Sequence, residues 1–246
     1  MNSDKEILEI FDAHCHENEG LEKVEMACIS GYNYTTNLKA LQIAKKFKMY
    51  CCFGFAPQEL QRKEYYPNLE EEIQKIKLQI EKNLYDEHFV AIGEVGLDNH
   101  WAKEIEHNQR QNFAFREFIE IAKEYKLPLV IHSRAAEKEC IEILIKSNVK
   151  KALLHCFGGN ANEAKIAVEA GYIISIPPLR SKERKKIIQQ IPLENLVIES
   201  DAPYLAKTST QTIVAAQMIS EYKKLEIEKV LEQTKQNAQK FFAKNF

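Results

Sequence analysis

The stretch Asp12-Ala-His-Cys-His16 follows the first predicted strand, residues 7–11, and decides between two α/β folds. A doubly wound open sheet usually has a Gly-rich phosphate-binding loop at this position. Here two histidines separated by one residue take its place. The sequence therefore favours a (β/α)8 barrel, whose functional residues lie at the carboxyl ends of its strands.

Short apolar runs rich in β-branched residues recur along the whole chain and predict eight strands. Most of them are continuously apolar rather than alternating, which is typical of parallel strands buried on both faces. The predicted strands are residues 7–11, 24–30, 49–55, 89–95, 127–131, 151–155, 172–176 and 196–198.

Amphipathic segments rich in Lys, Glu, Ala and Leu separate these runs and predict helices. They cover residues 37–47, 69–84, 109–125, 136–145, 162–170, 181–190, 210–225 and 227–242. The 246 residues give about 31 per strand-helix unit, and a (β/α)8 barrel typically needs about 250 residues. Since no linker divides the chain, we expect one α/β domain over residues 1–246, a single (β/α)8 TIM barrel of parallel strands.

The composition excludes several classes of protein. With 45% hydrophobic and 28% charged residues, the chain has enough apolar material for a core and is not a disordered sequence. A net charge of −2 argues against a broad basic surface for nucleic acid. No apolar run approaches the roughly 18 residues of a membrane span, and the acidic first residues are not a secretory signal. The six cysteines contain no Cys-x-x-Cys pair, so we expect free thiols and a cytoplasmic location.

Six side chains of metal-ligating type stand at the ends of predicted strands. They are His14, His16, Glu94, His132, His155 and Asp201. In a barrel these ends converge on one mouth, so residues nearly 190 positions apart would meet there. Three other histidines, His88, His100 and His107, lie in loops or at a helix start and are expected to be structural.

The spacing of the first two histidines has a physical meaning. Side chains two apart on a strand point to the same face, so His14 and His16 can reach one ion while Cys15 turns away. Asp12 shares their face and is a candidate to orient them. Four imidazoles and two carboxylates are too many for one tetrahedral zinc. The set suits two divalent cations bridged by a carboxylate, which can activate water for a phosphoryl displacement.

Five motifs resemble those of a known family, the TatD-related deoxyribonucleases among the amidohydrolase-like metal-dependent hydrolases. They are Phe11-Asp-Ala-His-Cys-His16, Gly93-Glu-Val-Gly-Leu-Asp98, Leu127-Pro-Leu-Val-Ile-His-Ser-Arg134, Leu154-His-Cys-Phe-Gly-Gly159 and Glu199-Ser-Asp-Ala-Pro-Tyr-Leu205. The resemblance runs from about Ile10 to Phe242, and the motifs occur in the family's order.

The resemblance implies a TIM barrel that hydrolyses phosphodiesters with two divalent metal ions, Mg²⁺, Mn²⁺ or Zn²⁺. By this resemblance His14, His16 and Asp201 would hold one ion, His132 and His155 the other, and Glu94 would bridge them. Asp201 would also take the proton from the attacking water, which makes Asp201 and Glu94 the candidate catalytic residues. The implied substrate is the 3′ end of a DNA strand, and no obligate protein partner is inferred.

The chain departs from the family in two places. The family's His-Pro-His segment after the third strand is replaced by Ala56-Pro-Gln58, and the loop after Leu205 lacks the family's Arg-Asn. Other side chains near the mouth are therefore the candidates for substrate contact: Arg134 and Arg180 for phosphate, Trp101 and Tyr204 for stacking on a base. Their alternative role is to form a solvated loop or to cover the barrel rim.

These departures motivate two further hypotheses. One is a hydrolase of small esters, amides or phosphoesters that uses the same metal site. The other is a pseudoenzyme that binds metal or nucleic acid without turnover. The second is disfavoured because six buried polar groups are costly to retain without a partner.

Overall fold

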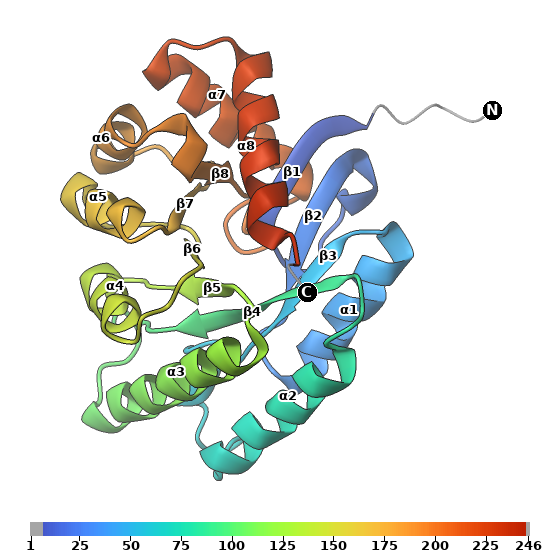
Figure 1. Ribbon diagram of the computed structural model, residues 1–246, viewed down its shortest axis with the longest axis vertical. Helices are drawn as coiled ribbons and strands as arrows, with labels where there is room; N and C mark the ends of the chain where they lie inside the picture. The colour runs from blue at the N-terminus through green and yellow to red at the C-terminus, as the bar shows by residue number, and fades with distance from the viewer. Residues whose placement is uncertain (1–6, 245–246) are drawn as a thin grey trace.

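The computed structural model describes residues 7–244, which form one sheet of eight parallel strands in the order β1 to β8 (Figure 1). The strands are β1 Leu8–Cys15, β2 Val24–Ser30, β3 Tyr50–Phe53, β4 Phe89–Gly96, β5 Leu129–His132, β6 Ala152–Leu154, β7 Ile173–Ile176 and β8 Leu196–Ile198. The predicted single (β/α)8 barrel of parallel strands is thus confirmed. The prediction of one domain over residues 1–246 also includes residues 1–6 and 245–246, which lie outside the described range.

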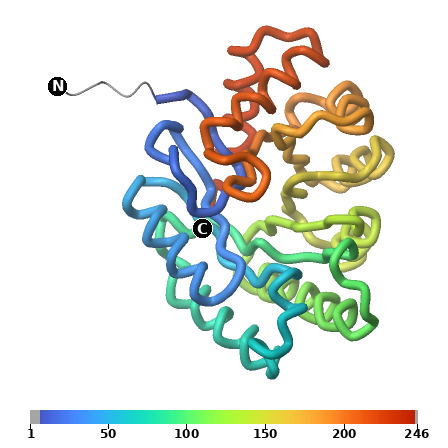
Figure 2. Tube along the Cα trace, turned by 180° about the vertical axis from the view of Figure 1, so that it is seen from behind, coloured from blue at the N-terminus to red at the C-terminus, as the bar shows by residue number. Residues whose placement is uncertain are grey.

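Helices surround the strands as an outer ring, which Figure 2 shows from the opposite side. They are α1 Tyr34–Phe47, α2 Leu69–Asn83, α3 Ile105–Tyr125, α4 Glu137–Lys146, α5 Ala161–Glu169, α6 Lys182–Gln190, α7 Thr212–Lys223 and α8 Ile227–Phe242. Short 3-10 helices lie at η1 Leu21–Lys23, η2 Glu59–Gln61, η3 Leu193–Asn195 and η4 Ser209–Gln211. In the described part of the chain, no helix is both long and apolar enough to cross a membrane.

Side-chain caps set the beginnings of several helices. Asn33, Asn68, Asn160 and Ser181 each accept hydrogen bonds from backbone N–H groups of the first turn that follows. At Asn33 the cap is reciprocal, because the side chain of Thr36 accepts from the backbone N–H of Asn33. This is why α1 begins at Tyr34, three residues before the predicted start.

The first strand is longer than predicted, which changes the position of His14. Parallel pairing with β2 continues as far as Cys15 opposite Ile29, so β1 ends at Cys15 and not at residue 11. The apolar pattern stops at Phe11, but Asp12 to Cys15 are all buried and remain part of the sheet. His14 therefore lies within the strand, where the ladder restrains its backbone, and His16 follows the strand end.

The barrel closes between β1 and the segment that follows β8. The backbone N–H of Asp201 donates to the carbonyl of His14 (3.0 Å), and that of His16 donates to the carbonyl of Ala202 (2.7 Å). The buried carboxylate of Asp12 accepts from the N–H and the hydroxyl of Ser200, at 2.8 and 2.5 Å. Asp12, expected to orient the histidines, joins the two edges of the sheet.

The barrel interior is filled at one end by the C-terminal helix. Side chains that point inward from the strands, such as Phe11, Val130 and Leu153, form one apolar cluster with Phe241 and Phe242 of α8. This plug leaves the opposite end, at the carboxyl ends of the strands, for a functional site. The six cysteines are free, five of them buried, as predicted.

Close approach of β4 to β5 requires glycine at position 96. Gly96 pairs with His132, has a φ of 137°, and a Cβ there would overlap the carbonyl oxygen of His132. We expect Gly96→Ala to lower the free energy of unfolding by about 2 kcal/mol or more, because backbone strain and overlap add. Urea unfolding followed by circular dichroism measures this change.

The matched control is Gly171→Ala. Gly171 also has a positive φ, 89°, but no atom lies within 4 Å of the Cβ position. Gly171→Ala should lower the free energy of unfolding only by the contribution of backbone strain, about 1 kcal/mol. Equal losses in the two variants would show that the approach of Gly96 to His132 does not constrain the fold.

Candidate metal centre

The six predicted ligand residues converge at the carboxyl end of the barrel. They come from β1, β4, β5 and the segments that follow β1, β6 and β8. Their donor atoms fall into three groups, each with its atoms within 4.8 Å of one another: His14, His16 and Glu94; Glu94, His132 and His155; and His14, His155 and Asp201. All are buried except Asp201, whose side chain is 16% exposed.

Glu94 occupies the middle of this cluster. Its Oε2 lies 3.8 Å from His14 Nε2 and 3.7 Å from His16 Nε2. Its Oε1 lies 2.6 Å from His132 Nδ1 and 3.4 Å from His155 Nε2. Each carboxylate oxygen therefore faces a different pair of imidazoles, which is the arrangement expected of a bridging carboxylate.

Asp201 lies beside the first pair of histidines. Its Oδ1 is 3.8 Å from His14 Nε2 and 3.6 Å from His16 Nε2. Because it is the most exposed of the six side chains, it borders the mouth. Asp201 thus lies near both histidines of the first motif, and Glu94 lies between these histidines and the pair His132 and His155.

His14 provides the test of whether a metal ion fits. Both of its ring nitrogens are buried and have no hydrogen-bond partner among residues 7–244, a costly situation for polar atoms. Burial, together with the neighbouring His155, holds the pKa of His14 well below its usual range, so the ring is neutral and able to donate a lone pair. Nitrogen and carboxylate donors around such an atom fit a divalent transition-type cation.

His16 and His132 are held by hydrogen-bond partners behind them, and a carboxylate lies behind His155 just beyond hydrogen-bond distance. His16 Nδ1 donates to the carbonyl of Ser30 (2.9 Å), and His132 Nε2 donates to Asp98 Oδ2 (2.9 Å). His155 Nδ1 lies 3.6 Å from Glu199 Oε1. Such partners fix the orientation of a metal-binding imidazole and select the nitrogen that faces the ion.

Asp98 and Glu199 were not singled out in the sequence. Both stand inside the quoted motifs, and both are fully buried acidic residues, so acidic residues next to the predicted ligands were the available signal. Asp98 also accepts from the backbone N–H groups of His100 and Trp101, each at 3.0 Å. The loop after β4 is therefore folded around the carboxylate that holds His132.

Charge inside the cluster is balanced between Glu94 and two histidines. Burial by itself would raise the pKa of Glu94, but His155 and the hydrogen bond from His132 hold it well below its usual range. In return, Glu94 and Glu199 outweigh burial and raise the pKa of His155. Burial raises the pKa of Asp201 to about 7, because this carboxylate is shielded from water and lies near Glu199 and Glu94.

Three of the four predicted substrate contacts lie around the mouth. The guanidinium of the exposed Arg134 lies 5.6 Å from the ring centre of Trp101, which is 55% exposed. Tyr204 is 66% exposed and its ring meets His16 edge-on, with 4.9 Å between centroids. Their contact with substrate stays a prediction.

Arg180 is engaged elsewhere. Its Nη1 lies 2.8 Å from Glu221 Oε2 and donates to the hydroxyl of Tyr222, also at 2.8 Å, both on α7. Substrate contact by Arg180 also stays a prediction, and it would require this pairing to open.

Gln58 contacts the cluster of six residues. It occupies one of the two positions at which the chain departs from the family's histidines. Its Nε2 lies 3.3 Å from both ring nitrogens of His132. Since Nδ1 of that ring faces Glu94 and Nε2 faces Asp98, equal distances place the amide over the face of the ring. Ala56 is buried. Gln58 therefore covers His132 and leaves the ring nitrogens to their other partners.

The histidines expected to be structural lie apart from the cluster. His88 Nδ1 donates to the carbonyl of Met49 (2.7 Å), and His107 lies in the first turn of α3 near Glu104. His100 meets Trp101 edge-on in the loop after β4. Among the described residues, none of these three belongs to a group of potential metal donors.

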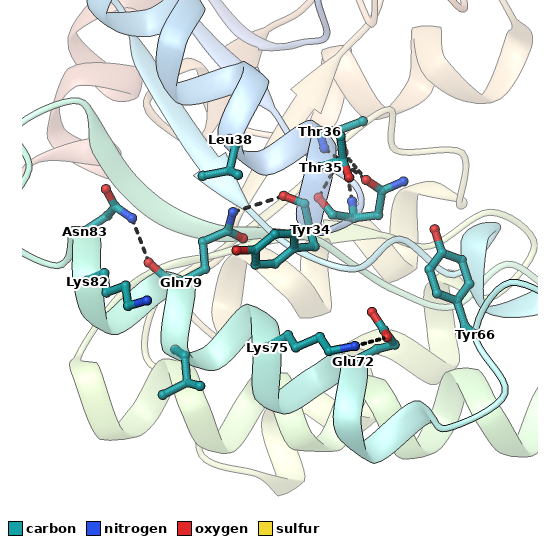
Figure 3. Close-up of a pocket in the computed structure, with 12 residues that line it drawn as sticks. Tyr34, Thr35, Thr36, Leu38, Tyr66, Glu72, Lys75, Gln79, Lys82 and Asn83 are labelled. Atoms are coloured by element: carbon teal, nitrogen blue, oxygen red, sulfur yellow. Dashed lines mark hydrogen bonds and ion pairs between the residues drawn. The ribbon is translucent and has the colours of Figure 1, made fainter.

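A large surface cavity lies away from this centre. It has a volume of about 730 Å³ and separates α1 from α2, with Tyr34, Leu38 and Lys75 in its wall (Figure 3). Gln79 closes its base by donating to the carbonyl of Tyr34 at 3.0 Å. Since none of the six ligand residues borders it, this cavity lies among the outer helices and apart from the cluster.

Comparison with known proteins gives one consistent picture. Residues 11–243 match the family model described as TatD related DNase. The human protein named Deoxyribonuclease TATDN3 is 30% identical, with 96% of this chain and 95% of that one covered. The Bacillus subtilis protein named uncharacterized metal-dependent hydrolase YabD is 29% identical, with 96% and 100% covered. The crystal structure of YJJV, a TatD homolog from Escherichia coli, superimposes with a TM-score of 0.84 at 20% identity, over 95% of this chain and 98% of that one, and so supports the fold.

Removing the partner behind His132 should weaken metal binding. We expect Asp98→Asn to lower the affinity for Zn²⁺ or Mn²⁺ by about 10- to 100-fold, because the imidazole loses its orienting carboxylate. Isothermal titration of the metal-stripped protein measures the change.

Glu139→Gln is the matched control. Glu139 accepts a hydrogen bond from the side chain of Asn99 at 3.2 Å. The substitution therefore removes one negative charge near the same loop without changing a contact to a histidine. The affinity of the Glu139→Gln variant for Zn²⁺ or Mn²⁺ should equal that of the wild type. An equal loss in both variants would assign the effect to general charge and not to the hydrogen bond on His132.

Proposed function

Because this chain belongs to the TatD-related DNase family, we propose that it is a divalent-metal-dependent exonuclease that cleaves phosphodiester bonds at the 3′ ends of DNA. That it is a metal-dependent hydrolase follows from the family and from relatives named deoxyribonuclease and metal-dependent hydrolase. The finer proposal concerns the substrate end and the residues that act on it. The observation that carries it is the buried cluster of four imidazoles and two carboxylates at the barrel mouth.

The cluster provides donors for two ions. In the proposed assignment His14, His16 and Asp201 hold one ion, His132 and His155 hold the other, and Glu94 bridges them. The distances from the two oxygens of Glu94 to two separate pairs of histidines support this division. The mixture of nitrogen and oxygen donors suits Zn²⁺ and Mn²⁺, and the carboxylates also suit Mg²⁺.

Two ions bound there would supply Lewis acidity for the phosphoryl oxygens and lower the pKa of a water molecule. The residues of the chain have separate roles around that chemistry. Asp201, at the edge of the cluster and partly exposed, is placed to take a proton from the attacking water. Glu94, which is buried, holds the two halves of the centre together.

Contacts with the strand are proposed on both sides of the mouth. Arg134 is placed to bind a phosphate with its guanidinium, and the exposed rings of Trp101 and Tyr204 are placed to stack on bases. With a net charge of −2, the protein would bind through such local contacts rather than a broad basic surface. A cytoplasmic location and function without an obligate protein partner remain predictions.

The test is the release of nucleotides from a 3′-tailed DNA duplex, with a 5′-tailed duplex as the comparison, in Mg²⁺, Mn²⁺ or Zn²⁺. We expect the wild type to prefer the 3′ tail and Asp201→Asn to be at least about 100-fold slower, since it loses the proton acceptor. Glu87→Gln is the control, because Glu87 is exposed in the loop before β4, at the opposite end of the barrel. It should retain wild-type rates.

Other outcomes identify the alternatives. If no metal raises nucleotide release above that of Asp201→Asn, the exonuclease proposal is wrong. Hydrolysis of chromogenic esters without any cleavage of DNA would support the hydrolase of small substrates. Tight DNA binding without turnover in any metal would support the pseudoenzyme.

A further inference from the structure

The cavity between α1 and α2 has the dimensions of a ligand site. Its volume of about 730 Å³ falls within the roughly 300 to 1,000 Å³ of pockets that bind small molecules. The ring of Tyr34 projects from α1 into the space between the two helices, and Tyr66 also belongs to the wall (Figure 3). Since none of the six clustered residues lines this cavity, a ligand bound there would be separate from a substrate at the metal centre.

Three partly exposed side chains make the wall apolar. Tyr34, Leu38 and Leu78 are 39 to 44% exposed, and all of them line the cavity. Tyr34 and Leu38 lie four residues apart on α1 and therefore on one face of that helix. Apolar and aromatic side chains gathered in a hollow are typical of a site for a small molecule.

The wall also carries one free positive charge. Lys82 lies one turn after Leu78 on the same face of α2, is exposed, and makes no ion pair with any described residue. The other lysine of the wall, Lys75, is paired with Glu71 and Glu72 at 3.0 and 2.8 Å. One free ammonium group beside an apolar wall favours a ligand that combines a flat ring with an anionic group.

The buried carboxylate of Glu59 connects this wall to the metal centre. Its Oε2 accepts hydrogen bonds from two wall residues, from the side-chain amide of Asn33 at 2.9 Å and from the hydroxyl of Tyr66 at 2.8 Å. The preceding residue, Gln58, places its amide nitrogen 3.3 Å from both ring nitrogens of His132. Two neighbouring side chains thus separate the cavity from a predicted metal ligand.

The segment between Gln58 and Tyr66 is held in place by an arginine of α3. Arg110 donates to the carbonyl of Leu60 at 3.0 Å and to that of Tyr66 at 2.7 Å. Packed and hydrogen-bonded segments can carry energetic coupling between two sites. A ligand that restrains Tyr66 would therefore also restrain Glu59 and, through it, Gln58.

We propose that this cavity binds a small planar aromatic anion and that the bound ligand strengthens metal binding at the barrel mouth. The ring lies against Tyr34 and the two leucines of the wall, and the anionic group faces Lys82. Ordering of Tyr66 by the first ligand reduces the entropy lost when the second site is ordered, so the two binding events are cooperative. The proposal concerns binding at both sites and does not depend on the cleavage of DNA.

The first experiment measures ligand binding by isothermal titration in Mn²⁺, with naphthalene-1-sulfonate as the probe. Octyl sulfate has the charge without the ring, and 2-naphthol has the ring without the charge. Both should bind at least about tenfold more weakly than the probe. Deoxyadenosine 5′-monophosphate and 1-naphthoate then compete with the probe, and the one that displaces it identifies the ligand as a nucleotide or an aromatic acid.

Two substitutions in the wall should weaken binding of the probe. Lys82→Glu reverses the free charge and Leu78→Trp fills the cavity, so each should weaken binding by about tenfold or more. Lys165→Glu and Ile166→Trp are the matched controls, at exposed positions of α5 outside the cavity. Both controls should bind the probe with wild-type affinity, and thermal unfolding of each variant checks that the fold is retained.

The second experiment measures the affinity for Mn²⁺ with and without a saturating concentration of the probe. In the wild type the probe should strengthen Mn²⁺ binding by about fivefold. Tyr66→Phe removes the hydroxyl that donates to Glu59 but retains the ring, so this variant should bind the probe and lose the effect on Mn²⁺. The control, Tyr65→Phe at the neighbouring exposed position, should keep the effect.

The proposal is overturned if the probe does not bind, if octyl sulfate or 2-naphthol binds equally well, or if folded Lys82→Glu and Leu78→Trp keep wild-type affinity. It is also overturned if the probe leaves the affinity for Mn²⁺ unchanged, or if Tyr66→Phe keeps the effect. Absence of DNA cleavage, with both titrations as expected, refutes the proposed function alone. Cleavage of DNA without binding of the probe refutes the ligand site alone.

Discussion

The rest of the structure depends on one carboxylate, that of Glu94, which faces four imidazoles inside a barrel. Buried charged and polar groups are destabilising unless they are paired. Glu94 lies within 2.6 to 3.8 Å of nitrogens from His14, His16, His132 and His155. Its charge is therefore shared among residues of β1 and β5 and of the segments that follow β1 and β6. The two ring nitrogens of His14 have no hydrogen-bond partner in the part of the chain that the structure describes. A metal centre is therefore the simplest account of this cluster.

Hydrogen bonds between β1 and the segment after β8 keep these groups in place. The β1 edge is joined to the segment after β8 by backbone hydrogen bonds from Asp201 and His16 and by the carboxylate of Asp12 on Ser200. Three residues of this seam, His14, His16 and Asp201, are themselves predicted ligands, so closing the barrel and positioning the site are one event. At the other end, the aromatic residues of α8 fill the interior. Polar chemistry is thereby restricted to the mouth.

The surroundings of the centre indicate how a substrate would be handled. Asp98 holds His132 from behind and, through its other oxygen, folds the loop that carries Trp101. Tyr204 lies against His16 on the far side. The predicted metal ligands and the candidate stacking residues are thus connected through single side chains. In the proposed function, such local contacts would engage a short segment of a strand, in agreement with the near-neutral charge of the chain.

The sequence by itself determined the fold class and the six clustered residues, because apolar periodicity and residue type are local properties. The strand ends followed from the same patterns to within two residues. The exception is β1, where pairing with β2 carries polar residues beyond Phe11 to Cys15. Only the tertiary structure decided what stands behind each ligand: Asp98 behind His132, Glu199 behind His155, and Ser200 on Asp12. It also placed Arg180 on Glu221 and the ring of Tyr204 against that of His16. The reason is physical, since these contacts join segments far apart in the chain, and their partners depend on strand register and barrel closure, which no local pattern of residues encodes.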